Sequence, residues 1–313
     1  MVATVWLCPG QGAQKVGMGQ DLADRFPAAR ATFEAIDRAL GFALSRLMFE
    51  GPEAELTATH NAQPAILAHS AAVLAVLGGR VDGAAVAAAG HSLGEYSAYV
   101  AAGALSAPDA AALVRRRGEL MRDAGAARPG AMAAVLGLAT AAVETACREA
   151  SQDGAVAVAA NLNAPDQTVI SGDPAAVAAA GALCRARGAT RVVPLKVSGA
   201  FHSPLMAPVA PALRAALERA PFRDPAFPVL ANATAEPVRD AARARRLLAD
   251  QLTTPVRWVA CMQRAVELAG AGARFIEVGP GAVLAGLLKR IAPQATSVSL
   301  GTAAAVTQFL EAA

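Results

Sequence analysis

The chain has few of the residues that mark a disulfide-stapled, metal-binding or nucleic-acid-binding protein. Its formal net charge is only +3 and aromatic residues make up 4% of it, so an extended nucleic-acid surface is not expected. The four cysteines lie far apart and form no Cys-x-x-Cys pair, which predicts buried free thiols rather than a disulfide framework. We therefore expect no bound metal and no nucleic-acid partner. The cysteines are Cys8, Cys147, Cys184 and Cys261.

Long apolar runs are also missing, although 55% of the 313 residues are hydrophobic. The apolar stretches are rich in alanine and are broken by charged residues, Gly or Pro, so none offers the ~20 residues that a membrane span needs. The first residues carry no basic segment before their apolar run, unlike a secretory signal. We expect a cytoplasmic protein with a large core, no membrane association and a monomeric state.

A Gly-x-Ser-x-Gly pattern, Gly90-His91-Ser92-Leu93-Gly94, is the first positive signal. The residues before it, 85–89, predict a short buried strand, and residues 93–102 predict a helix. A strand, sharp turn and helix in this order present a serine nucleophile, and the glycines leave room for the turn. The five-residue pattern alone is weak evidence. Glu95 is either a charge at the helix start or part of the site, and the sequence leaves both readings open.

The order of predicted elements indicates an α/β fold. Strands are predicted over 4–8, 228–232 and 274–278, and helical regions over 21–40, 64–77 and 247–268. Between them lies the order β-α-β-β-α-β of a ferredoxin-like unit, with strands at 132–138, 156–161, 167–171 and 191–196 and helices at 140–150 and 174–187. The predicted organisation is a large α/β-hydrolase-like core with a parallel sheet, residues 1–126 and 197–313, into which a ferredoxin-like subdomain, residues 127–196, is inserted.

A nucleophilic serine needs a base, and the chain has only four histidines. We expect His60 to lie in a loop and His69 to be packed in a helix. His91 adjoins Ser92, and neighbours around a tight turn point in different directions. His202 is therefore the best candidate for the base.

No acid between the serine and His202 suggests itself as a third member of a triad. We infer a dyad in which a backbone carbonyl fixes the tautomer of the imidazole. The oxyanion formed on attack needs two backbone donors. The Leu93 N–H supplies one, and the Gly10-Gln11-Gly12 turn is a candidate for the other, although that turn is also a common strand-to-helix connection.

Six short motifs occur in order along nearly the whole chain: Pro9-Gly10-Gln11-Gly12-Ala13-Gln14, Gly90-His91-Ser92-Leu93-Gly94-Glu95-Tyr96, Arg117-Gly118, Gly199-Ala200-Phe201-His202-Ser203, Gln251-Leu252 before Pro255-Val256-Arg257-Trp258, and Glu277-Val278-Gly279-Pro280-Gly281. Together they resemble malonyl-CoA:acyl carrier protein transacylases, both the enzyme of fatty acid synthesis and the stand-alone acyltransferases of polyketide assembly lines.

The resemblance implies a role for each motif residue. Ser92 would carry the malonyl ester, His202 would act as base and then acid, and the main-chain carbonyl of Gln251 would hold its ring. Arg117 would bind the free carboxylate of malonate, for which a planar guanidinium is well suited; its neighbours Arg115 and Arg116 are expected on the helix surface. The implied oxyanion-hole amides are those of Gln11 and Leu93, and the implied substrate-binding residues are Arg117, Phe201, Met121 and Gln63.

The implied reaction is ping-pong transfer of malonyl from malonyl-CoA to the phosphopantetheine thiol of an acyl carrier protein, with no cofactor bound to the chain. Phe201 and Leu93 resemble malonyl-selective members, and excluding one extra methyl group is worth only about 1–3 kcal/mol. Two alternatives remain, a serine acyl hydrolase on a related scaffold and a non-catalytic subunit that docks a carrier protein. A cation at Arg117 opposes the first. The presence of Ser92 and His202 opposes the second.

Overall fold

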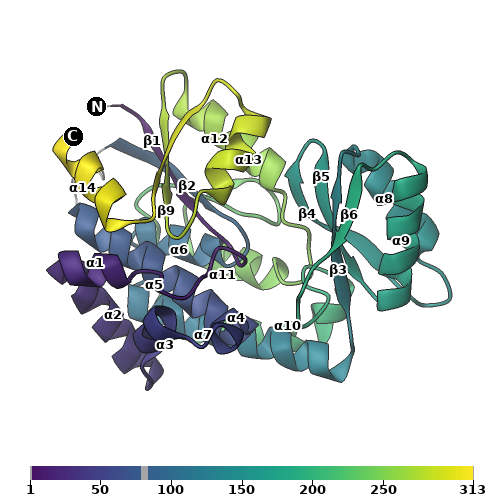
Figure 1. The fold of residues 1–313 in the computed structure, drawn as a ribbon, viewed down its shortest axis with the longest axis horizontal. Coiled ribbons are helices and arrows are strands. Elements are labelled where there is room, and N and C mark those ends of the chain that lie inside the picture. The colour runs from purple at the N-terminus through teal and green to yellow at the C-terminus, as the bar shows by residue number, and fades with distance from the viewer. Residues whose placement is uncertain (1, 79–83, 313) are drawn as a thin grey trace.

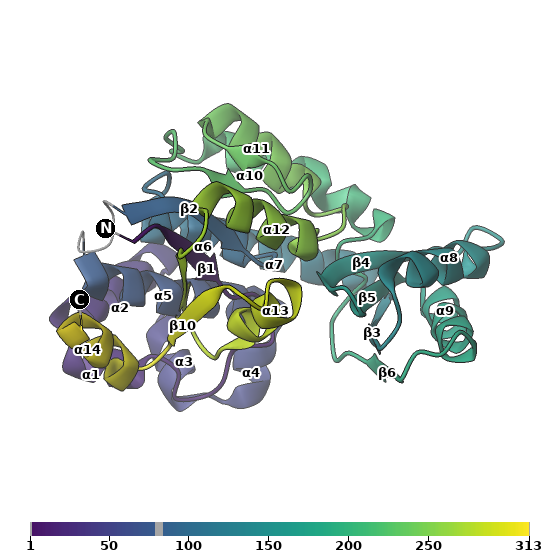
Figure 2. The same cartoon turned by 90° about the horizontal axis from the view of Figure 1, so that it is seen from above.

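The computed structural model describes residues 2–78 and 84–312, which form two parts built on two separate sheets. Figure 1 shows the larger part, which holds both ends of the chain, and the smaller part with helices α8 and α9 at the opposite end of the molecule. Figure 2 shows the same separation from above. The predicted fold class, an α/β-hydrolase-like core with an added ferredoxin-like unit, is confirmed.

The larger part is built on a six-stranded sheet of order β10-β9-β1-β2-β7-β8. All of its neighbours pair in parallel except β7 and β8. All five residues of β1 are buried, as expected for a parallel strand with helices on both faces. The strands are β1 (Thr4–Cys8), β2 (Ala85–Gly90), β7 (Val229–Leu230), β8 (Pro237–Val238), β9 (Arg274–Val278) and β10 (Thr296–Leu300).

Alternate side chains of β1 enter two different hydrophobic cores. Trp6 and Cys8 pack in the larger core, with the helices that precede and follow β2. Val5 and Leu7 pack in the second core with the helices before and after β9. The helices of the first face are α1 (Gln20–Arg25), α2 (Pro27–Leu40), α3 (Leu44–Glu50), α4 (Glu53–Thr57), α5 (Thr59–Leu77), α6 (Gly94–Ala101), α7 (Ala107–Ala127), α10 (Ala210–Arg219), α11 (Ala241–Asp250) and α14 (Ala303–Ala312), and those of the second are α12 (Trp258–Ala269) and α13 (Val283–Ile291).

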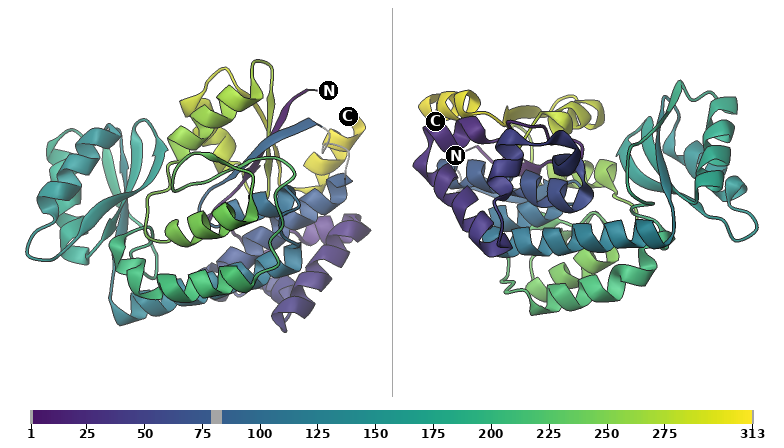
Figure 3. Two further views of the ribbon diagram at one scale, coloured as in Figure 1. Left: turned by 180° about the vertical axis from the view of Figure 1, so that it is seen from behind. Right: turned by 60° about the horizontal axis from the view of Figure 1, so that its bottom comes forward.

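The smaller part contains the predicted β-α-β-β-α-β order. Its antiparallel sheet has the order β4-β5-β3-β6, and α8 and α9 pack together on it around a third core. Helix α7 runs from the larger part toward this sheet (Figure 3). The boundaries at 127 and 196 stay a prediction. The elements are β3 (Ala131–Leu136), α8 (Thr140–Ala150), β4 (Ala157–Ala164), β5 (Gln167–Gly172), α9 (Pro174–Ala186) and β6 (Arg191–Pro194).

Two predicted helical regions are each divided in the structure. Residues 21–40 form α1 and α2, because Phe26 is extended and Pro27 starts a new helix at its first position. Residues 247–268 form the end of α11 and then α12, and the irregular segment between them begins with Gln251 and contains Pro255. The break matters, because it frees a main-chain carbonyl at the end of α11.

The prediction that His60 lies in a loop is wrong, because α5 begins at Thr59 rather than at Pro64. Proline has no N–H, so Pro64 leaves the carbonyl of His60 without its helical donor. Arg115 Nη1 donates to that carbonyl from α7 at 3.2 Å. Among residues 2–78 and 84–312, no helix is both long enough and apolar enough for a membrane crossing.

Candidate active site

Ser92 lies in the turn between β2 and α6 with φ of 53°, in the left-handed region that side-chain-bearing residues rarely adopt. A Cβ on Gly90 would lie 1.9 Å from the carbonyl carbon of Gly94, and a Cβ on Gly94 would lie 2.1 Å from the carbonyl oxygen of Cys8. Both glycines are therefore steric requirements of the turn. Asn232, which follows β7, stabilises the turn: its Oδ1 accepts a hydrogen bond from the Ser92 N–H at 2.8 Å.

The fold brings His202 to Ser92 across 110 positions of sequence, as predicted. Ser92 Oγ and His202 Nε2 are 2.7 Å apart. On the other side of the ring, His202 Nδ1 lies 2.9 Å from the carbonyl oxygen of Gln251. A carbonyl only accepts, so Nδ1 carries the proton and Nε2 presents its lone pair to the serine hydroxyl. This is the geometry of a dyad with a backbone orienting group.

His202 is held in the neutral form that a general base needs. It is 3% exposed, and its burial together with the nearby charge of Arg117 lowers the imidazole pKa to about 3. The hydrogen bond to the Gln251 carbonyl opposes this shift. At neutral pH the imidazole is therefore unprotonated and ready to accept the serine proton.

Arg117 is a buried cation directly beside the nucleophile. It projects from α7, is 1% exposed, and donates hydrogen bonds to Ser92 Oγ at 3.0 Å, to Gln251 Oε1 at 3.0 Å and to Gln63 Oε1 at 2.7 Å. All three acceptors are uncharged. Within the described part of the chain, no carboxylate lies within 4.0 Å of this guanidinium. The guanidinium is thus buried with no carboxylate in direct contact, and an anionic ligand in the cavity can pair with it.

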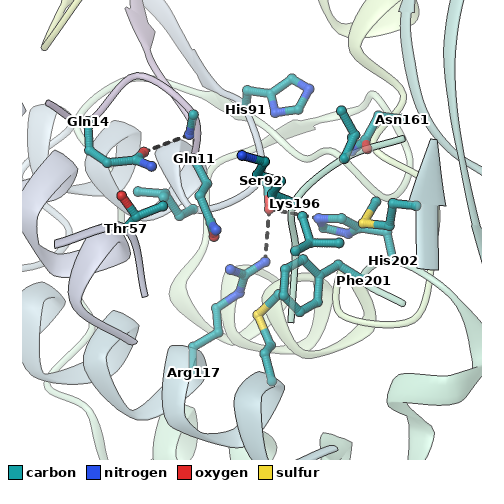
Figure 4. A pocket seen from close by; sticks show the side chains of 16 residues that line it. Gln11, Gln14, Thr57, His91, Ser92, Arg117, Asn161, Lys196, Phe201 and His202 are labelled. Atoms are coloured by element: carbon teal, nitrogen blue, oxygen red, sulfur yellow. Dashed lines mark hydrogen bonds between the residues drawn. The ribbon is translucent and has the colours of Figure 1, made fainter. Parts of the chain in front are cut away.

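A cavity of about 250 Å³ opens onto these three side chains. Figure 4 shows Ser92, His202 and Arg117 converging on it, with the hydrogen bond from the guanidinium to the hydroxyl drawn. The smaller part contributes to the wall through Met132 and Asn161, so the cavity lies between the two parts. Its apolar wall consists of Leu93, Met121, Met132, Leu195, Val197 and Phe201.

The other residues singled out in the sequence take several positions. Gln11, Leu93, Met121 and Phe201 line the cavity, whereas Gln63 does not: it is fully buried behind Arg117, and its amide nitrogen contacts Met121 Sδ at 3.3 Å. All four cysteines are buried free thiols.

The remaining histidines and arginines that the sequence analysis considered do not form part of the dyad. His91 points away from Ser92 in Figure 4, and its Nε2 lies 2.8 Å from Asn163 Oδ1. His69 is buried in α5, as expected. The side chains of Arg116 and Arg115 are 50% and 25% exposed and both pair with Glu119, and neither lines the cavity, in agreement with their prediction as helix-surface charges.

Three features of the site were not predicted from the sequence. The amide of Gln251, and not only its carbonyl, is part of it: Gln251 Nε2 donates to the carbonyl of Ser92 at 2.9 Å and to Glu95 Oε2 at 2.7 Å. Asn232 Nδ2 donates to the carbonyl of Gly90 at 2.8 Å. Glu95 is fully buried and also accepts from the Asn232 N–H at 2.9 Å. Of its two interpretations, a charge at the helix start or a part of the site, the structure supports the second.

No local signal could have revealed this network. Its hydrogen bonds join residues more than 130 positions apart, and none of the three side chains forms a recognisable spacing with another. The position of Glu95 inside the Gly-x-Ser-x-Gly helix start was the only hint, and it equally fitted a charge at a helix N-terminus.

Comparison with known proteins agrees with the geometry. The family described as an acyl transferase domain matches residues 5–307. A malonyl CoA-acyl carrier protein transacylase of Bacillus subtilis is 44% identical over 292 residues, which are 93% of this chain and 91% of the relative. A solved malonyl-CoA:acyl carrier protein transacylase of Xanthomonas oryzae superposes with a TM-score of 0.94 at 41% identity, covering 100% of this chain and 98% of that one.

A further solved structure contains a malonyl-transacylase in complex with a type II polyketide synthase acyl carrier protein. It superposes with a TM-score of 0.93 at 39% identity and covers 99% of this chain and all of that one. The family matches residues 5–307, and a relative is 44% identical over 93% of the chain. The chain therefore belongs to the acyl transferase domain family.

Proposed function

We propose that the chain transfers a malonyl group from malonyl-CoA to the phosphopantetheine thiol of an acyl carrier protein, through a malonyl ester of Ser92. The single observation that carries the proposal is the Arg117 guanidinium, buried and 3.0 Å from Ser92 Oγ, with uncharged partners. Such a site favours an acyl group that ends in a carboxylate. Relatives named malonyl CoA-acyl carrier protein transacylase support the same substrates.

The first half-reaction forms the ester. Ser92 Oγ attacks the thioester carbonyl while its proton passes to Nε2 of His202, 2.7 Å away. The tetrahedral intermediate collapses, the bond to sulfur breaks, and the imidazolium returns the proton to the departing CoA sulfur. The Gln251 carbonyl keeps the ring in place and favours the protonated imidazole while it exists.

The oxyanion of that intermediate would be bound by the N–H groups of Leu93 and Gln11. Both residues line the cavity. Within the described residues, neither N–H donates to a protein acceptor, whereas the N–H of Ser92 is engaged by Asn232 and that of Gly12 by Gln14 Oε1. Two free, preorganised donors beside a nucleophile are what an oxyanion hole requires.

Binding of the malonyl carboxylate would also tune the base. The positive charge of Arg117 is the second cause, after burial, of the lowered pKa of His202. A carboxylate paired with Arg117 offsets that charge, so the imidazole becomes a stronger base when the correct acyl group is present. An acyl group without a carboxylate does not raise the basicity of His202. Malonyl is therefore favoured in the rate of ester formation as well as in binding.

The second half-reaction reverses the first with the carrier thiol in place of CoA. The thiol gives its proton to His202 and attacks the ester, and Ser92 Oγ leaves with that proton. We infer that no cofactor is needed, since nucleophile, base and oxyanion donors all come from the chain and phosphopantetheine arrives on the carrier. The acyl carrier protein is the proposed partner, as in the solved complex of a related malonyl-transacylase.

The chain is proposed to act as a cytoplasmic monomer, because one chain contributes every residue of the site. It serves fatty acid or polyketide synthesis in this proposal, since both use a malonyl loader. Phe201 and Met121 narrow the cavity next to Ser92 and are proposed to disfavour branched acyl groups. One added methyl group costs about 1–3 kcal/mol in such a pocket, so methylmalonyl transfer should be slow but measurable.

A transfer assay tests the proposal. The enzyme is mixed with malonyl-, methylmalonyl- or acetyl-CoA and a carrier protein bearing phosphopantetheine, and the acylated carrier is measured by mass spectrometry. We expect malonyl-carrier to form fastest. Release of free malonate, methylmalonate or acetate without carrier acylation would show a hydrolase instead.

A further inference from the structure

Glu95 is a buried carboxylate that the transfer steps above do not use. It lies in the first turn of α6, three residues after the nucleophile, and is 0% exposed. Its Oε2 accepts two hydrogen bonds, from the Asn232 N–H and from Gln251 Nε2. Its Oε1 is buried with no hydrogen-bond partner among the described residues. An ionised oxygen without a donor is costly in a protein interior, so this carboxylate needs a compensating charge nearby.

Arg117 supplies that charge through a single bridging amide. Arg117 Nη2 donates to Gln251 Oε1 at 3.0 Å, and Gln251 Nε2 donates to Glu95 Oε2 at 2.7 Å. The amide oxygen therefore faces the cation and the amide nitrogen faces the anion, which is the favourable orientation of its dipole toward both. In the empty site one buried cation and one buried anion balance each other, with Gln251 held between them.

A malonyl carboxylate disturbs this balance. If it pairs with Arg117, the desolvated region holds two anions and one cation, and Glu95 loses the charge that offset its burial. An acetyl group carries no charge and leaves the pair as it was. The two acyl groups therefore place different demands on Glu95, although neither touches it.

Given malonyl transfer as the function, we propose that Glu95 is the internal counter-charge of Arg117 in the empty site, positions Gln251, and takes up one proton from solvent when a malonyl carboxylate binds Arg117. The carboxylate of Glu95 becomes a carboxylic acid, and no bond of the substrate changes in that step. Its Oε2 keeps accepting from Asn232 and Gln251, and the proton goes to the unpartnered Oε1. The site returns to electrical neutrality with the substrate bound.

The surroundings of Glu95 make this proton uptake feasible near neutral pH. Burial raises the pKa of Glu95 to about 7, against the hydrogen bonds from Asn232 and Gln251 and the charge of Arg117, which lower it. The other titratable groups that interact with Glu95 are Tyr96, Tyr99 and Cys261, and burial raises the pKa of each, so they are uncharged near neutral pH. Burial likewise lowers the pKa of the site imidazoles of His91 and His202, so they are also uncharged.

Linkage then fixes the direction of the pH effect. A ligand whose binding takes up a proton binds more weakly as pH rises through the pKa of the free site, by at most about tenfold per pH unit. Malonyl loading should therefore weaken above about pH 7, while acetyl loading should not. The acyl exchange itself converts a hydroxyl and a thioester into an ester and a thiol, so it contributes no net proton at neutral pH.

A proton count during a single turnover tests the proposal in the unmodified enzyme. Enzyme in excess is mixed with malonyl-CoA or acetyl-CoA in weakly buffered solution at about pH 7.5 with a pH indicator, and the acyl-enzyme is counted by mass. We expect uptake of a substantial fraction of a proton per malonyl-serine and none per acetyl-serine. Full malonyl loading without proton uptake would overturn the role of Glu95. Failure to form malonyl-serine would instead contradict the proposed function.

Two matched variants assign the proton. Glu95→Gln keeps an oxygen that can accept from Asn232 and Gln251 but removes the charge, and it should abolish both the uptake and the pH dependence of malonyl loading. Glu277→Gln changes another fully buried carboxylate, which caps α13 through the N–H groups of Leu284 and Ala285, and should leave the uptake intact. Uptake that persists in folded Glu95→Gln enzyme would overturn the assignment. If Glu95→Gln does not fold, the comparison of malonyl with acetyl in the unmodified enzyme decides.

Discussion

Ser92 Oγ and His202 Nε2 lie 2.7 Å apart, and both residues have left-handed backbone conformations, with φ of 53° and 56°. Non-glycine residues rarely adopt this region, and it costs of order 1–3 kcal/mol each. The surrounding hydrogen bonds hold them there: Asn232 engages the Ser92 N–H, and the carbonyl of Gln251 engages His202 Nδ1. The dyad is thus preorganised before any substrate binds, and the contacts of the folded chain offset the conformational cost of the two backbone positions.

Arg117→Lys should separate recognition of the carboxylate from the chemistry of transfer. Lysine keeps a positive charge but not the planar fork that reaches Gln63, Ser92 and Gln251 together. A hydrogen bond to a charged group contributes about 1.5–3 kcal/mol, and lysine cannot make the paired bonds of the guanidinium, so kcat/KM for malonyl-CoA should fall roughly 10-fold to 150-fold. The value for acetyl-CoA should change far less, as measured in the same transfer assay.

The control is Arg116→Lys on the adjacent, half-exposed position, which pairs with Glu119 at the helix surface. It should leave the malonyl rate within about twofold, since exposed ion pairs contribute about 1 kcal/mol or less. Equal losses for malonyl and acetyl in Arg117→Lys would refute the carboxylate-binding role of Arg117.

Gly94→Ala should destroy the nucleophile turn. The added methyl group would lie 2.1 Å from the backbone oxygen of Cys8, and backbone cannot move aside as a flexible side chain can. We expect a loss of more than about 4 kcal/mol in the free energy of unfolding, measured in urea, or no folded protein at all.

Gly286→Ala is the matched control for that substitution. Gly286 lies within α13, and a Cβ there meets nothing within 4 Å. Alanine is the better helix former, so this variant should gain about 0.5–1 kcal/mol. A Gly94→Ala protein as stable as the Gly286→Ala protein would contradict the tight contact between the turn and β1.

His69 should make the fold sensitive to acid. Its ring is 1% exposed, both ring nitrogens lack a partner among the described residues, and burial lowers its pKa to about 4. The unfolded chain binds this proton from about pH 6.5 downward while the folded chain resists it, so stability falls as pH drops from about 6.5 to about 4, by up to about 3 kcal/mol.

Urea unfolding of His69→Leu at about pH 7 and about pH 4.5 measures this contribution. From the higher pH to the lower, the free energy of unfolding should fall less for the variant than for the unmodified protein. His60→Leu, at a partly exposed histidine of the same helix, should differ less. An unchanged acid sensitivity in His69→Leu would show that other groups control it.

The sequence revealed those parts of the site and fold that depend on local patterns. The turn at Ser92 was predictable because its glycine spacing and its strand-turn-helix order all lie within residues 85–102. The ferredoxin-like unit was predictable because its strands and helices follow one another in a regular order. His202 followed from the scarcity of histidine. The carbonyl of Gln251 and the part played by Arg117 came from family resemblance rather than from periodicity.

The remainder depends on tertiary contacts that no spacing encodes. Glu95 and Gln251 are 156 positions apart, and Glu95 and Asn232 are 137 apart, yet their hydrogen bonds hold the turn and the base together. The position of Gln63 behind Arg117, rather than in the cavity wall, likewise follows from how α5 packs on α7. Such arrangements appear only when the chain is folded.

The most direct test of the account is the mass of the intact protein after brief mixing with malonyl-CoA in the absence of any carrier. We expect an added mass of one malonyl group, located on Ser92 by peptide mapping, which disappears when holo-carrier protein is supplied. His202→Ala, with Ser92 in place, should form the adduct far more slowly. An enzyme that transfers malonyl to the carrier without ever carrying it, or that carries it on another residue, would contradict the proposed mechanism.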